Sequence, residues 1–181
     1  EADNTAAEAA TEKGVSKFQI GDLIVHPMHG AGVIDDVVRE KVAGATKEYY
    51  VFKMPVGGLI LKIPVANCQA IGIRSIISEA EAEAFFAGIP ALEVESSSNW
   101  NKRDQENLLR LKSGDLNEVA RVVKGLMRRD SRRGLSTGER KMLHSAKQII
   151  VSEIALVEGC AYQDAEARLD HAVMQKPPVP Q

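Results

Sequence analysis

Ser98-Asn99-Trp100-Asn101-Lys102-Arg103 divides the chain into two halves of different character. Short, strand-like runs precede this hexapeptide, and helices rich in Lys and Arg follow it. The hexapeptide holds the only Trp of the chain, with two cations close behind. A large planar apolar side chain beside cations is suited to press on a nucleic-acid base step while the charges hold phosphates. Residues 98–103 are therefore a fold boundary and a candidate nucleic-acid contact.

Trp100 also has a purely structural interpretation. Trp100, Leu108 and Leu111 fall at near-helical spacing, so the indole could cover the apolar face of a helix. Large aromatic side chains are mostly buried on average, and the residue types alone favour the core position. Both interpretations of Trp100 stay open at this point.

The composition is that of an ordinary globular chain. Its 181 residues, 44% apolar and 27% charged, suffice for one or two domains with a sizeable core. No apolar run approaches the ~20 residues needed to span a bilayer, and no signal-peptide pattern opens the chain. Cys68 and Cys160 lie far apart in no metal or redox spacing. We expect a cytoplasmic protein with free thiols and no membrane partner.

The charges are distributed unevenly along the chain. Residues 1–99 contain 8 Lys or Arg and 14 Asp or Glu, whereas residues 100–148 contain 13 and 6. Residues 149–181 are acidic again, with 2 and 5. A charged run is often only a solvated helix face, but a two-to-one excess within one block favours a polyanionic partner.

The N-terminal half has the pattern of a small β-domain. Residues 1–16 lack apolar periodicity and are expected to form a disordered leader. Residues 17–75 then contain five short β-branched runs separated by turn signals, which predicts a small, strongly bent barrel or half-barrel of SH3-like or Tudor-like type. The predicted strands are 23–25, 32–38, 48–54, 59–65 and 69–73.

The C-terminal half has regular helical punctuation. Ser78 and Glu81 form a capping box that opens a short helix, so residues 76–98 are expected to be a short helix and a linker. Residues 99–174 then predict a compact all-helical domain, and residues 175–181 a disordered tail. The predicted helices are 99–112, 115–129, 136–158 and 161–174. The fold class is therefore α+β, with the barrel first and the helices second.

The helix that starts near Asp115 has two distinct faces. Leu116, Val119 and Val123 belong to its apolar stripe. Arg121 and Lys124 belong to the opposite, non-acidic side, which continues into the basic run 128–133. The pattern predicts a module whose cations gather around one loop and two helix ends, where backbone N–H groups add to phosphate affinity.

Catalytic and metal sites find little support in the sequence. His26 and His29 flank Pro27 in a strand-to-turn context without a third ligand nearby, which favours structural turn residues. No Ser-His-Asp set, paired carboxylates or phosphate-binding Gly-rich loop is present. We expect no enzyme, no cofactor and no bound metal, and a metalloenzyme built on His26, His29 and Cys68 stays as a rival class.

Several segments in order carry a resemblance to a known family. They are Gly21-Asp22-Leu-Ile-Val-His-Pro with His29-Gly30, Lys47-Glu48-Tyr49-Tyr50, Ile63-Pro64, Asn99-Trp100, Leu111-Lys-Ser-Gly-Asp115, Arg128-Arg129-Asp130 and Arg133-Gly-Leu-Ser-Thr-Gly-Glu139. From Phe18 to about Val173 the chain resembles the CarD/CdnL family of bacterial transcription regulators. Transcription-repair coupling factors share only the barrel signature, so the helical half distinguishes a CarD/CdnL resemblance from a resemblance to those factors.

The resemblance implies two partners. The Tudor-like domain would bind the β subunit of bacterial RNA polymerase, which acts with its sigma factor. The helical domain would bind promoter DNA in the minor groove at the upstream fork of the bubble and stabilise the open complex. Trp100 matches the family's wedge. A monomer that is nucleoid-associated through polymerase is expected, and an architectural DNA- or RNA-binding protein that ignores polymerase is the alternative.

The resemblance also assigns site residues. Together with Lys124 and Lys141 from the basic helix faces, the predicted DNA-binding residues are Trp100, Lys102, Arg103, Arg128, Arg129, Arg133 and Arg140. The implied polymerase-binding residues are Glu40, Lys41, Val42, Leu61 and Lys62. Glu40 stands where some relatives carry a basic residue, and Gln105 replaces a cation found in others. We therefore expect the polymerase contact to depend on Lys62 and on the backbone of an exposed strand edge.

Overall fold

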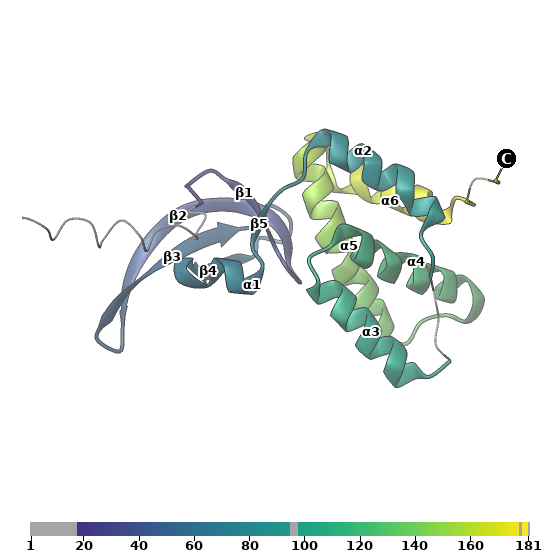
Figure 1. The fold of residues 1–181 in the computed structure, drawn as a ribbon, viewed down its shortest axis with the longest axis horizontal. Helices are drawn as coiled ribbons and strands as arrows, with labels where there is room; N and C mark the ends of the chain where they lie inside the picture. Colours follow the sequence, from purple (N-terminus) through teal and green to yellow (C-terminus); the bar gives the residue numbers. More distant parts are fainter. Residues whose placement is uncertain (1–17, 95–97, 178, 181) are drawn as a thin grey trace, which may run out of the picture.

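The computed structural model describes residues 18–94, 98–177 and 179–180. A twisted β-sheet, here called the sheet unit (residues 18–75), lies beside a group of packed helices, the helical unit (residues 79–174) (Figure 1). The predicted order, strands first and helices second, is confirmed. The predicted leader at 1–16 lies outside the described residues.

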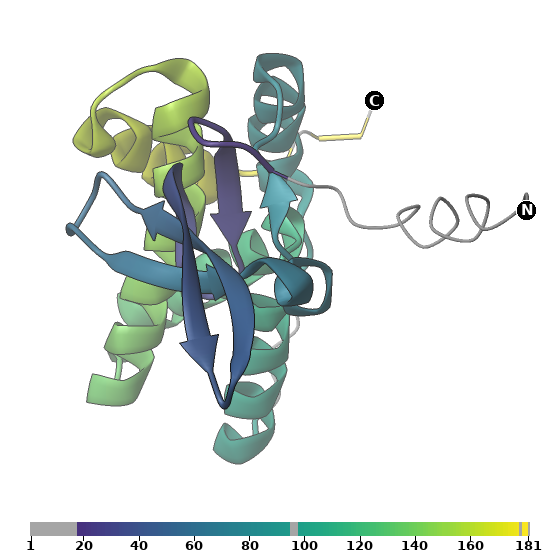
Figure 2. The ribbon, with the colours of Figure 1, turned by 90° about the vertical axis from the view of Figure 1, so that its left-hand side faces the viewer.

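The sheet unit is a five-stranded antiparallel sheet with the strand order β4-β3-β2-β1-β5. Its strands are β1 (Leu23–His26), β2 (Gly30–Val42), β3 (Ala45–Lys53), β4 (Ile60–Pro64) and β5 (Arg74–Ser75). The sheet is strongly curved and stands in front of the helical unit (Figure 2). β4 and β5 are its two edges, so the predicted bent half-barrel is an open sheet.

A long hairpin of β2 and β3 forms the middle of the sheet. Its turn residues Ala43 and Gly44 have φ of 51° and 81°, the positive values that a two-residue hairpin turn of the favoured hand requires. Alternate residues on the inner face, such as Ile34 and Phe52, are fully buried and belong to one apolar cluster under the sheet. The hairpin tip extends away from the helical unit (Figure 1).

The fifth predicted strand is wrong. Residues 69–73 belong mainly to a short helical segment made of η1 (Val65–Asn67) and α1 (Cys68–Ile71), and β5 begins only at Arg74. Gly72 adopts φ of 93° and its N–H caps α1, which turns the chain into β5. Short apolar runs do not distinguish a strand from one helical turn.

The helical unit follows the predicted capping signals closely. Its elements are α2 (Glu79–Gly88), η2 (Ile89–Ala91), α3 (Trp100–Lys112), α4 (Leu116–Arg133), α5 (Thr137–Glu158) and α6 (Tyr162–Met174). Ser78 and Ser136 form complete capping boxes. α4 continues four residues past its predicted end at Arg129. No helix in the described ranges is long and apolar enough to cross a membrane.

α2 is part of the helical core. Its Ala82, Phe85 and Phe86 pack in one cluster with Ile150 of α5 and Leu169 of α6. The α2 segment, which the sequence suggested as a short helix before a linker, is therefore fixed to the other helices.

A buried carboxylate joins the two units. Glu153 of α5 is fully buried, and both of its oxygens accept from Arg74 of β5 at 2.7 and 2.8 Å. The backbone N–H of Ile77 donates to the same carboxylate at 2.9 Å. Bidentate pairing with Arg and a backbone donor satisfy a charge whose burial would otherwise be costly. Glu153 thus holds the chain at the point where it leaves the sheet.

The chain just after the β1–β2 turn makes a second contact with α5, in which its backbone approaches the helix closely. Ala31 N–H donates to Ser152 Oγ at 3.0 Å, and Gly30 has φ of +112°. A Cβ at residue 30 would lie 2.3 Å from that oxygen and 3.2 Å from the carbonyl oxygen of Gln148. Only glycine fits this backbone and this approach.

Gly30→Ala is therefore expected to destabilise the protein by about 2–4 kcal/mol, since overpacking and a strained φ each cost of order 1–3 kcal/mol. Urea unfolding followed by circular dichroism measures the change. Gly21→Ala is the matched control, because Gly21 has φ of +92° with open space around its Cβ position. If Gly30→Ala lowers the free energy of unfolding no more than the control does, the close approach to Ser152 does not contribute to stability.

Candidate nucleic-acid interface

Trp100 is half-exposed, not part of the core. Its side chain is 52% exposed, and Trp100 is the first residue of α3, after the N-cap Asn99. Side chains in an α-helix lean toward its N-terminus, so an indole at the first position projects past the helix end. Leu111 is the buried residue of α3. The core interpretation of Trp100, which residue types favoured, is wrong.

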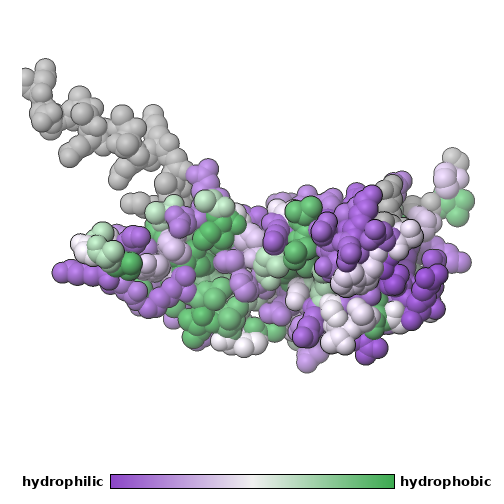
Figure 3. Space-filling view, turned by 90° about the horizontal axis from the view of Figure 1, so that it is seen from below, coloured by the Kyte–Doolittle hydropathy of each residue, from purple (hydrophilic) through white to green (hydrophobic). Residues whose placement is uncertain are grey.

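A groove of about 760 Å³ opens beside Trp100. Its lining residues come from α3, from α4 and from the segment that precedes α3. They are Val94, Ser98, Trp100, Arg103, Gly125, Arg128, Arg129, Arg132 and Arg133. Four predicted arginines, at 103, 128, 129 and 133, are thus gathered around the predicted tryptophan. On the α3 side of the molecule, hydrophilic residues cover much of the helical unit (Figure 3).

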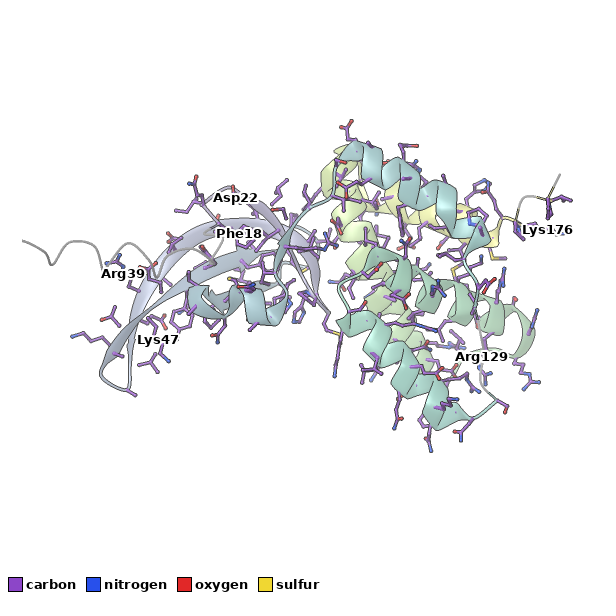
Figure 4. The ribbon with its side chains drawn as sticks, in the orientation of Figure 1. Phe18, Asp22, Arg39, Lys47, Arg129 and Lys176 are labelled. Carbon is purple, nitrogen blue, oxygen red and sulfur yellow. The ribbon has the colours of Figure 1, made fainter. Side chains whose placement is uncertain are left out.

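The arginines of the groove differ in how they are partnered. Arg129, on the side of α4 toward α3 (Figure 4), pairs with Glu139 of α5 at 3.0 Å. Arg128, Arg132 and Arg133 are exposed, and none of the three forms an ion pair with another described residue. Cations without an acidic partner are the ones available to phosphates. The positive charges of the groove that are available to phosphates therefore lie at the end of α4.

Arg132 was missed by the site prediction. It lies in the same basic run as Arg128, Arg129 and Arg133, and the run itself was the available signal. Because α4 continues to Arg133, the cations at 128 and 132 are one helical turn apart on one face.

Lys124 does not lie on the surface, so its predicted place on the exposed basic face is wrong. It is fully buried, and its Nζ donates to the carbonyl oxygens of Ile89, Pro90 and Leu92 at 2.8–2.9 Å. Burial, with a contribution from Arg128, lowers the pKa of Lys124 below its ordinary value. Three carbonyls replace the water that a surface lysine would keep.

The other predicted cations lie outside the groove. Lys102 is exposed and 3.9 Å from Glu106, one turn further along α3. Arg140 and Lys141 are exposed near the start of α5, and Arg140 Nε donates to the carbonyl of Leu135 at 3.3 Å. These cations extend the basic surface without lining the groove.

The residues assigned to a protein partner lie in the sheet unit. Glu40 of β2 and Lys62 of β4 form an ion pair with each other across β3. Lys41 and Val42 are exposed next to the hairpin turn. The labels of Arg39 and Lys47 mark this end of the hairpin in Figure 4. Leu61 is half-buried and packs against the sheet's apolar cluster. The five predicted residues thus fall on the hairpin end and the β4 edge.

The rival metal site is not supported by the geometry. The rings of His26 and His29 pack edge to face, with centroids 4.7 Å apart, and burial together with His26 lowers the pKa of His29. Burial also raises the pKa of the Cys68 thiol, which donates to the carbonyl of Pro64. Within the described residues, no group of three or more His, Cys, Asp or Glu side chains is placed to hold a metal ion.

A curved sheet with a free edge, joined to a helical unit that carries an arginine-lined groove, is the architecture of a CarD-like transcription regulator. Residues 18–77 match the family model for the CarD-like/TRCF RID domain, and residues 86–170 match that for the CarD C-terminal domain. The chain is also 31% identical over 142 residues to a Bacillus subtilis protein described as "Putative transcription factor YdeB", covering 78% of this chain and 93% of that one. The chain belongs to the CarD family.

The exposed arginines without an acidic partner predict a salt-dependent affinity for DNA. Each lost phosphate contact reduces the logarithmic salt slope by about 0.9, so Arg128→Ser with Arg133→Ser should reduce it by about 1.8. Fluorescence anisotropy of a labelled duplex across a salt series measures the slope. Because both side chains are exposed, unfolding stability should change by less than about 1 kcal/mol.

Arg39→Ser is the matched control for the salt series. Arg39 is an exposed cation on the hairpin, far from the groove (Figure 4). It should leave the slope unchanged. A double variant at 128 and 133 that keeps the wild-type slope would show these arginines to be ordinary solvated charges.

Proposed function

We propose that this protein binds the β subunit of bacterial RNA polymerase through its sheet unit and promoter DNA through its helical unit. The DNA contact lies in the minor groove at the upstream fork of the bubble, and it stabilises the open complex that polymerase forms with its sigma factor. The protein acts as a monomer in the cytoplasm, at the nucleoid, through its association with polymerase.

One observation carries the DNA half of this proposal. The only tryptophan of the chain stands half-exposed at the start of a helix, beside a groove in which Arg128, Arg132 and Arg133 have no acidic partner among the described residues. A flat apolar ring can enter an unstacked base step, and the arginines can hold the phosphates on either side. Neither a solvated helix face nor a core tryptophan needs this combination.

The energetics favour the melted state of the DNA. Unstacking a base step costs on the order of a few kcal/mol, and the upstream edge of a bubble is already unstacked. A wedge therefore binds the open complex better than closed duplex, and a ligand shifts an equilibrium only by such a difference in affinity. The result is slower closure of the bubble.

The sheet unit supplies the second contact. β4 is an edge strand, and Ile60 on it is 59% exposed. An edge strand offers unpaired backbone groups to which a partner can add a strand, and Lys62 and the hairpin tip flank this edge. Tethering to polymerase raises the effective concentration of the helical unit at the promoter, so weak DNA affinity suffices.

Trp100→Ala should shorten the half-life of open complexes on a linear promoter while polymerase capture and most duplex affinity are kept. Its stability loss should stay well below the ~3–5 kcal/mol of truncating a buried Trp, because half of the side chain is exposed. Phe or Tyr at this position should restore part of the lifetime, since a flat apolar ring is the required feature. Leu109→Ala, on the exposed side of α3, is the control and should change nothing.

An unchanged half-life with Ala at position 100 would contradict the wedge. Co-purification of the full chain with core polymerase tests the other half of the proposal. High affinity for bare duplex without a polymerase complex would instead favour an architectural DNA- or RNA-binding protein.

A further inference from the structure

Lys124 is a buried cation with an unusual set of partners. It lies in the middle of α4, yet its ammonium group reaches three carbonyl oxygens near the end of α2 and η2, at 2.9 Å (Ile89), 2.9 Å (Pro90) and 2.8 Å (Leu92). The last carbonyls of a helix lack intrahelical partners and carry partial negative charge. An ammonium group has three donors, so each donor of Lys124 meets one of these acceptors.

Two neighbours of Lys124 on α4 hold the next residues of the same segment. We call residues 89–94 the strap. Arg121 Nη1 donates to the carbonyl of Glu93 at 3.4 Å, and Val94 packs onto Gly125 so closely that a Cβ there would lie 2.9 Å from Val94 Cγ1. Arg121, Lys124 and Gly125 share one face of α4. The strap is therefore fastened to α4 along its length.

The end of the strap lines the same groove as the tryptophan. Val94 and Trp100 line the same groove, six residues apart in the chain. The buried side chain of α3 among the described residues is Leu111, at the far end of that helix. The start of α3, which carries Trp100, is thus positioned by the strap together with half-buried residues of α3, such as Arg103 and Asp104, that line a pocket shared with α4.

We propose that Lys124 is a positioning residue for Trp100: by fastening the strap to α4, it holds the indole beside the arginine groove without touching DNA itself. This inference rests on the proposed wedge function. It assigns to Lys124 a structural role inside the protein in place of the predicted phosphate contact at the surface. An apolar side chain of the same length could fill the space but would take this donor from three carbonyls, of which, among the described residues, only that of Ile89 also accepts from the backbone N–H of Leu92.

The test compares Lys124→Met with Arg128→Met, one turn further on the same helix. Because Trp100 is the only tryptophan, acrylamide quenching of its fluorescence reports its position without any partner. In Lys124→Met, quenching should increase and the open-complex half-life should fall toward that of Trp100→Ala, with an unchanged salt slope for DNA binding. In Arg128→Met the salt slope should fall by about 0.9 while quenching stays as in the wild type.

Gly125→Ala keeps the proposal testable if Lys124→Met does not fold. Alanine is the better helix former, yet its Cβ must displace Val94 and hence the strap. This variant should fold, change the quenching of Trp100 and shorten the half-life.

Three results would overturn the proposal. They are wild-type quenching in folded Lys124→Met, wild-type quenching in Gly125→Ala, and a reduced salt slope in Lys124→Met, which would place Lys124 on DNA. Failure of the proposed wedge function gives a different result: Trp100→Ala would then leave the open-complex half-life unchanged. The quenching experiment does not depend on that function, because it reports the position of Trp100 in the free protein.

Discussion

The carboxylate of Glu153 is the contact on which the arrangement of the two units depends. It is fully buried, and its donors come from β5 and from the connection to α2, so it ties both to the C-terminal part of α5. Removing one partner of such a buried pair typically costs about 3–5 kcal/mol, since the other charge stays buried and unpaired. The same turn of α5 also receives Gly30 and Ala31 through Ser152. The adjacent residues Ser152 and Glu153 of α5 therefore contact the start of β2 and the connection from β5 to α2, respectively.

A fixed junction gives the proposed function a defined geometry. The hairpin tip and the β4 edge lie at one end of the molecule, and the helical unit with the Trp100 groove lies at the other (Figure 1). If polymerase holds the first end, the junction sets where the indole meets the promoter. Positioning then acts at two levels: Glu153 places the helical unit, and Lys124 places Trp100 within it.

Much of this fold could be predicted from local signals. Ser78, Asn99, Asp115 and Ser136 cap the helices that the sequence assigned to them, and Ala43-Gly44 turns the chain between the predicted strands 32–38 and 48–54. Caps and two-residue turns act through neighbouring residues, which is why the sequence alone reveals them.

The errors come from interactions between distant parts of the chain. Lys124 has the spacing of a solvated cation, but its partners are backbone carbonyls more than thirty residues earlier, and carbonyls have no sequence signature. The buried pair of Arg74 and Glu153 was missed for the same reason, since 79 residues separate the two. For Trp100 the residue type alone favoured the core, whereas the family resemblance implied an exposed wedge; its place at the first position of α3 leaves it half-exposed.

The central claim, that a rigid junction presents Trp100 to the promoter, is tested most directly by the open-complex half-life of Glu153→Gln. The amide keeps the shape of the carboxylate and can still accept from Ile77, but it loses the charge that pairs with Arg74. At a temperature where the variant is folded, the account predicts a shorter half-life than wild type, with unchanged polymerase capture and an unchanged salt slope for duplex binding. A folded Glu153→Gln variant that keeps the wild-type half-life would contradict it.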